Sequence, residues 1–292
     1  MGFFSLLFGG KDLSPEEEKK EQQRKQFDLL KYDGVKAIKI GQVDYAVKCF
    51  TEALKLKDDL ETHDYLSQAL LRKGDSQGAM KELDILAQAE PDNALIQMRI
   101  AQVAYAEGDY KLMATACQKS LQLQPDVPQT YYLYAQAYKG QQNLIGCIAM
   151  LTKAVQLKAD YADAYLLRGQ TLLGMGETDA ADADALWLLD KVGAHEDVLM
   201  LKARIEAIRG NTERALKAYD IVTEVNPFAI DAYRERGQLK YNAGDKAGAE
   251  TDMQKVLELD PQALADVSGE YSAEGIEQRV KQAYSAVNPL GL

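Results

Sequence analysis

The sequence repeats itself at a nearly constant interval, and this interval constrains the fold more than any other feature. When the chain is aligned on its recurring Gly-Asp pairs, the first interval is 33 residues and every later one is 34. A fixed period of about 20 to 50 residues is typical of arrays built from one supersecondary unit. The frames begin at Phe27, Leu60, Ala94, Pro128, Ala162, Glu196 and Ile230. Seven such units would account for most of the chain.

Two positions of the frame carry small side chains in nearly every repeat. Small residues let two helices approach until their backbones almost touch, so these positions mark the closest crossing of a helix pair. At position 8 the residues are Gly34, Ser67, Ala101, Ala135, Gly169, Ala203 and Gly237. At position 20, where six of the seven are small, they are Ala46, Ala79, Met113, Cys147, Ala181, Ala215 and Ala249.

Turn residues divide each frame into two helices. Position 15 is glycine in six frames and Gln142 in the other, and glycine suits the left-handed residue that ends a helix. The next residue in frames two to seven is acidic or asparagine, and Asp or Asn there would cap the following helix. These residues are Asp75, Asp109, Asn143, Glu177, Asn211 and Asp245. Proline at position 32 of four frames would end the second helix, so each frame predicts helix, tight turn, helix.

These residues together resemble the tetratricopeptide repeat. The seventh frame matches the family pattern at Tyr233, Gly237, Gly244, Ala249, Met253 and Pro261. The fifth frame departs from it most, with Ala185, Leu188 and Gly193 at positions 24, 27 and 32. The resemblance implies an all-α fold: a right-handed superhelical solenoid of seven tetratricopeptide repeats, built from antiparallel helix pairs, with flanking helices at both ends.

The frames and their flanks give the expected organisation of the chain. Residues 1–13 are an apolar N-terminal tail, and residues 14–26 are a helix leading into the array, because Ser14 and Pro15 followed by acidic residues are typical of a helix start. Residues 262–292 hold a C-terminal capping helix, over about 273–286, and a tail. The seven repeats span 27–261, divided as 27–59, 60–93, 94–127, 128–161, 162–195, 196–229 and 230–261.

Charge and composition exclude several functional classes. The formal net charge is −11 and no basic patch offsets it, so a nucleic-acid partner is not expected. Three cysteines without close spacing do not predict a disulfide framework and favour a reducing, cytoplasmic location. No apolar run approaches the roughly 18 residues that a membrane-spanning helix needs.

The chain shows no catalytic or metal-binding constellation. His63 and His195 lie in different repeats, and His63 occupies an aromatic position of the frame where packing is expected. Cys117 and Cys147 fall at positions that the family packs in its core. We expect no enzymatic activity, no metal and no cofactor.

The resemblance places a binding groove on the first helix of each repeat. Glutamine recurs at position 9 in five repeats, and its amide can both donate to and accept from the main chain of an extended peptide. Apolar residues at positions 5 and 12 would give this groove a hydrophobic centre. The expected groove residues are Gln68, Met98, Gln102, Tyr105, Tyr132, Gln136, Leu166, Gln170, Met200, Arg204, Arg234 and Gln238. The expected partner is a protein or peptide; alternatively, these residues pack against one another as structural lining.

The first residues are apolar and lie outside the repeats. Phe3 and Leu7, and likewise Phe4 and Phe8, are spaced by four and would share one face of a helix. Such a segment is open to three interpretations: a loose or self-packed tail, a peripheral contact with the inner membrane surface, and a protein contact. The leading functional hypothesis is a non-enzymatic adaptor that binds a protein segment in its groove. The alternative is a membrane-associated assembly factor anchored through residues 2–8. The sequence predicts no particular oligomeric state.

Overall fold

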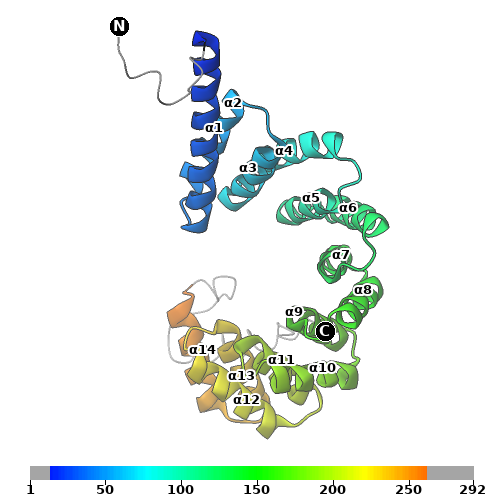
Figure 1. Ribbon diagram of the computed structural model, residues 1–292. Helices are drawn as coiled ribbons and strands as arrows, with labels where there is room; N and C mark the ends of the chain where they lie inside the picture. Colours follow the sequence, from blue (N-terminus) through cyan, green and yellow to red (C-terminus); the bar gives the residue numbers. More distant parts are fainter. Residues whose placement is uncertain (1–13, 262–292) are drawn as a thin grey trace. The chain divides into compact units, whose positions relative to one another are not determined.

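The computed structural model describes residues 14–261, which form fourteen α-helices and no strands. The chain divides into two compact units, Met1–Asp126 and Val127–Leu292. Helices α1–α6 belong to the first unit and α7–α14 to the second (Figure 1). The predicted all-α repeat fold is confirmed.

The first unit consists of three helical hairpins. Its helices are α1 Pro15–Lys39, α2 Val43–Leu56, α3 Leu60–Lys73, α4 Ser76–Ala89, α5 Ala94–Ala106 and α6 Tyr110–Leu123. Each odd-numbered helix packs against the even-numbered helix that follows it, and each hairpin stacks on the next through α2 with α3 and α4 with α5. Ser14 caps α1: its hydroxyl accepts from the Glu17 amide while the Glu17 carboxylate accepts from the Ser14 amide.

The second unit continues the same construction with four hairpins. Its helices are α7 Pro128–Gly140, α8 Leu144–Leu157, α9 Ala162–Gly174, α10 Thr178–Lys191, α11 Glu196–Ile208, α12 Thr212–Val225, α13 Ile230–Asn242 and α14 Lys246–Leu259. Successive hairpins stack through α8 with α9, α10 with α11 and α12 with α13, and the first helices α9 and α11 also touch. Stacking of this kind buries the apolar face that a single hairpin would leave open.

The small frame positions lie where the helices of each hairpin cross. All seven residues at position 8 are buried. Those at position 20, Met113 and Cys147 included, are 0% exposed. Gly34 shows why size matters, because a Cβ atom built on it would lie 2.5 Å from the ring of Phe50. Close helix approach explains the small residues at these positions, with Met113 the exception in the third hairpin.

The hairpin turns share one backbone conformation. The six glycines at position 15 have φ between +70° and +89°, in the left-handed region. Gln142 replaces glycine at this position and adopts the same conformation, with φ of 60°. A side chain in this region is strained, because its Cβ approaches the carbonyl oxygen. The turn geometry is therefore imposed by the stacked helices, whichever residue occupies the turn.

Replacing Gln142 with glycine is expected to stabilise the protein. The substitution removes the left-handed strain, and we expect the free energy of unfolding to rise by about 1 kcal/mol. Urea unfolding followed by far-UV circular dichroism measures the change. Gly108→Ala, at the equivalent turn between α5 and α6, should shift the midpoint in the opposite direction.

Side-chain caps begin most of the second helices as expected. Asp75, Asp109, Asn143 and Asp245 each accept a hydrogen bond from a backbone amide in the first turn, at 2.8 to 3.0 Å. Asn211 does not, and the prediction of a cap there is wrong. Its side-chain amide donates to the carboxylate of Glu206 at 2.7 Å instead, because Glu206 is buried and needs donors.

Two predicted segments lie outside the described residues. These are the apolar tail with Phe3, Phe4, Leu7 and Phe8, and the C-terminal capping helix. Membrane anchoring through residues 2–8 stays a prediction. Within residues 14–261, none of the helices is both long enough and apolar enough to cross a bilayer.

Candidate functional site

The twelve expected groove residues all lie on the first helix of a hairpin. Four belong to the first unit, on α3 and α5, and eight belong to the second, on α7, α9, α11 and α13. Steps of three and four residues keep positions 5, 9 and 12 on one side of each helix.

In the first unit, an ion pair engages the first of the expected glutamines on this face. The side-chain amide of Gln68 donates to Asp64 on its own helix at 3.1 Å, and Arg99 of α5 binds the same carboxylate. Gln102 is exposed and makes no side-chain hydrogen bond within the described chain. Tyr105 is 47% exposed, with its ring centroid 6.5 Å from that of Tyr110, while Met98 of the same helix is half-buried.

In the second unit, two glutamines present open amides. Gln136 on α7 and Gln170 on α9 are half-buried, and neither makes a side-chain hydrogen bond to another residue between 14 and 261. Gln238 differs, because it is buried and its amide donates to Asn242 on its own helix at 3.0 Å. The expected row of five equivalent glutamines is therefore divided: Gln68 and Gln238 have partners within their own helices.

Two tyrosines and a leucine form the apolar part of this face. Tyr132 packs against Tyr161, with their ring centroids 5.3 Å apart, in a cluster around buried Leu151. Leu166 is half-buried against Leu173 and Leu201. These side chains contribute both to the core and to the surface, so the two interpretations of the apolar centre, groove and lining, overlap at these positions.

A pocket of about 410 Å³ opens on the second unit, between the first helices α11 and α13. Four of the expected groove residues line it, and the turn before α13 forms another wall. Buried Met200 lies at the pocket, and Phe228, in that turn, is 74% exposed. The lining residues are Gln170, Glu196, Asp197, Met200, Arg204, Asn226, Phe228, Ala229, Ile230, Asp231, Ala232, Arg234 and Asp260.

Both arginines of the pocket have acidic partners. Arg204 binds Glu235 of α13 in a two-pronged arrangement, with Nε to Oε2 at 2.9 Å and Nη2 to Oε1 at 2.7 Å. The hydrogen bonds to Glu235 raise the pKa of Arg204. Arg234 binds Asp231 at 2.7 Å. The expected pair of groove cations is thus neutralised within the protein.

The carboxylates of the pocket outnumber its guanidinium groups. Glu196, Asp197, Asp231 and Asp260 line it, against Arg204 and Arg234. Glu196 accepts a hydrogen bond from Asn226 Nδ2 at 2.7 Å, and Asp197 is exposed without an ion pair in the described residues. Both acids lie in the first turn of α11, where the helix dipole favours them. The pocket therefore carries an excess of negative charge.

His63 is buried, as its frame position predicts, but it is also held by two carboxylates. Its Nδ1 lies 2.5 Å from Glu82 and its Nε2 lies 2.8 Å from Asp58. Burial alone would lower the pKa of His63, but the hydrogen bonds to Glu82 and Asp58 outweigh burial and raise the pKa. Residues 14–261 contain no group of three or more side chains suited to a metal ion. This arrangement is an ion-pair site within the first unit.

The raised pKa of His63 predicts a pH-dependent stability. Protonated His63 is favoured in the folded state. Its contribution to the free energy of unfolding is therefore complete below about pH 6.5, the pKa of histidine in the unfolded chain, and is lost as the pH rises through the higher pKa of the folded state. We expect the difference in free energy of unfolding between the wild type and His63→Phe to be largest below about pH 6.5 and to shrink as the pH rises above it. Urea titrations below and above this pH measure it, and a constant difference would contradict the assignment.

Family comparison decides the class of the chain. Two models described as tetratricopeptide repeat match it, one at residues 65–128, 166–220 and 201–263, which is more than half of the chain, and the other at residues 128–161. The chain belongs to the tetratricopeptide repeat family. Proteins of this family are interaction scaffolds that bind protein or peptide partners.

Two relatives with curated descriptions share part of the chain. It is 27% identical over 154 residues to the DnaJ homolog subfamily C member 7 homolog of Schizosaccharomyces pombe. It is 23% identical over 237 residues to tetratricopeptide repeat protein 16 of Mus musculus. These matches cover 53% and 74% of this chain but only 29% and 31% of the relatives, so the chain spans about a third of their length.

Solved tetratricopeptide structures share the fold. A tetratricopeptide repeat protein from Parabacteroides merdae superposes with a TM-score of 0.67 at 17% identity, covering 89% of this chain and 99% of that one. PilW, a type IV pilus biogenesis factor, superposes with a TM-score of 0.64 at 16% identity, and the match covers 76% of this chain and 98% of PilW. YrrB, described as having an unusual peptide-binding site, superposes with a TM-score of 0.52 at 15% identity, and the match covers 68% of this chain and 97% of YrrB.

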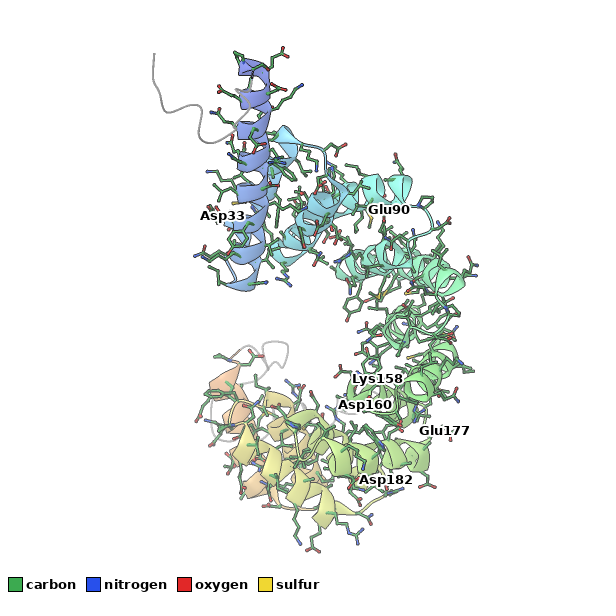
Figure 2. The ribbon with its side chains drawn as sticks, in the orientation of Figure 1. Asp33, Glu90, Lys158, Asp160, Glu177 and Asp182 are labelled. Atoms are coloured by element: carbon green, nitrogen blue, oxygen red, sulfur yellow. The ribbon has the colours of Figure 1, made fainter. Side chains whose placement is uncertain are left out.

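Sequence reasoning missed the buried ion pairs inside these tetratricopeptide hairpins. Arg168 binds Asp184 across α9 and α10 at 2.7 and 2.9 Å, and Arg236 binds Asp252 across α13 and α14. Both pairs join frame positions 7 and 23, and both acids are buried. Asp182 of α10, labelled in Figure 2, accepts from Lys202 and Arg209 of the next hairpin. The sequence pattern that could have indicated these ion pairs is arginine at position 7 together with aspartate at position 23 in the same two frames.

Proposed function

We propose that this chain is a non-enzymatic scaffold that holds an extended segment of another protein on the first helices of its second unit. The observation that carries the proposal is the pair of open amides at Gln136 and Gln170, at the same position of successive hairpins. An extended peptide repeats its donors and acceptors along its length, so two such amides can bind the main chain of one segment.

The neighbouring surface supports the same proposal. Tyr132 and Leu166 lie one turn before the two glutamines on α7 and α9, and the pocket beside Gln170 offers a recess for a side chain. A polar row next to apolar side chains and a recess is the usual composition of a peptide site. YrrB, which shares this fold, is described as having an unusual peptide-binding site, and peptide binding is the use that we propose for this chain.

Selection from a displayed random-peptide library tests the proposal without knowledge of the natural partner. We expect the full-length chain to enrich peptides that bind with a dissociation constant in the micromolar range. The Gln136→Ala, Gln170→Ala double variant should bind the best of these peptides at least tenfold more weakly, because it loses two hydrogen-bonding amides.

A matched control shows whether the loss of affinity comes from the first-helix face or from replacing any two glutamines. Gln156 of α8 and Gln254 of α14 are exposed glutamines on second helices, and replacing both with alanine should leave peptide affinity unchanged. Circular dichroism should show the same helix content in all three proteins. Equal affinity of the wild type and the Gln136, Gln170 variant, or failure to enrich any peptide, would refute the proposal.

A further inference from the structure

We propose that the pocket between α11 and α13 receives a lysine or arginine side chain of the bound segment, so that the scaffold selects basic peptides. This inference rests on the proposed function, because it assigns a side-chain subsite to the same face. The occupant is a cationic side chain carried by a peptide, and its recognition combines three properties of the pocket: charge, an aromatic wall and a fixed turn.

The charge of the pocket is not balanced by its own arginines. Arg204 is bound by Glu235, and Arg234 is bound by Asp231. Glu196 has an amide partner but no cationic one, and Asp197 has no side-chain partner, within residues 14–261. These two carboxylates can therefore accept from an incoming ammonium or guanidinium group without breaking an existing ion pair.

Apolar side chains stand beside these carboxylates. The ring of Phe228 is largely exposed at the pocket, and Ile230 and Met200 lie near it. Lysine and arginine carry an aliphatic stem that packs on such a surface, while their charge is attracted to the face of an aromatic ring. An acidic side chain would meet repulsion here, and a purely apolar one would leave the carboxylates unpaired.

The wall of the pocket is held in place by Asn226. Its Nδ2 donates to Glu196 at 2.7 Å, and its Oδ1 accepts from the Phe228 amide at 2.9 Å. One side chain thus ties the turn before α13 to the first turn of α11. The Phe228 backbone and the Glu196 carboxylate are consequently positioned before a ligand arrives, which reduces the entropy lost on binding.

The test compares peptide selections on three full-length proteins. The first is the wild type and the second is Glu196→Gln, Asp197→Asn, which keeps the hydrogen bond from Asn226. The third is a control, Asp190→Asn, Glu224→Gln, with the same change in charge on exposed second-helix residues. We expect lysine and arginine to be enriched on the wild type and the control but not on the pocket variant. The best wild-type peptide should bind the pocket variant at least tenfold more weakly.

Phe228→Ala tests the aromatic wall of the pocket independently of its charge. The substitution should leave folding intact, because this exposed ring contributes little to it. It should weaken the same peptide several-fold while leaving a glutamate-substituted version of that peptide unaffected. Enriched peptides without basic residues, or basic enrichment that persists on the pocket variant, would overturn this inference and leave the proposed function standing. Failure to enrich any peptide on the wild type would overturn both.

Discussion

Replacing Asp252 with alanine is expected to lower the free energy of unfolding by about 3 kcal/mol, the lower end of the range for breaking a buried ion pair. The Asp252 side chain is 2% exposed, and it accepts from Arg236 at 2.5 and 3.0 Å and lies 2.9 Å from Lys240. Its loss leaves two largely buried cations without their main partner. Urea unfolding followed by circular dichroism measures the effect.

Asp220 provides the control for this substitution. It binds the same arginine at 2.8 Å, but its side chain is 52% exposed. Exposed ion pairs contribute little, so Asp220→Ala should cost less than about 1 kcal/mol. Equal losses at the two positions would show that burial of the carboxylate does not determine the stability of the hairpin formed by α13 and α14.

Gly34→Ala is expected to destabilise the first unit by about 1 to 3 kcal/mol. A Cβ atom at this position would lie 2.5 to 2.8 Å from three atoms of the Phe50 ring. Phe50 is fully buried, so neither the ring nor the helix can move without disturbing the packing of α1 on α2. Thermal or urea unfolding measures the loss.

Gly174→Ala is the matched control at a helical glycine. It lies at the end of α9, and nothing is within 4 Å of the position that its Cβ would occupy. Alanine is a better helix former than glycine, so this substitution should be neutral or stabilise by about 0.5 kcal/mol. If Gly34→Ala were also neutral, close approach of the helices would not explain the small residues of the frame.

The backbone of this protein is largely predictable from its sequence, since each marker acts locally. Position 15 requires a left-handed turn, and small residues at positions 8 and 20 permit close helix crossing. Gln142 occupies such a turn without being glycine, because the helices on either side impose its conformation. Asn211 makes no side-chain cap hydrogen bond; its Nδ2 donates to Glu206, whose burial depends on tertiary packing.

The binding face is less predictable, because it depends on what each side chain already binds. Gln68 and Gln238 have hydrogen-bonding residues four positions away, Asp64 and Asn242, and bind them. At that spacing Gln136 has Tyr132 and Gly140, Gln170 has Leu166 and Gly174, and neither glutamine amide is bound by these neighbours. The difference between the bound and the open glutamines was therefore visible in the sequence, in the residues four positions away. The pairing of Arg204 with Glu235 was not, because it joins two hairpins across 31 residues.

The most direct test of the binding face is to observe the glutamine side chains themselves. The side-chain amides of Gln136 and Gln170 can be assigned in a 15N–1H spectrum through their alanine variants, with Gln156 and Gln254 as references. On titration with a selected peptide, we predict that the signals of Gln136 and Gln170 shift and saturate together while the references stay fixed. Saturable binding that moves Gln156 or Gln254 and leaves Gln136 and Gln170 unchanged would contradict a binding face on the first helices.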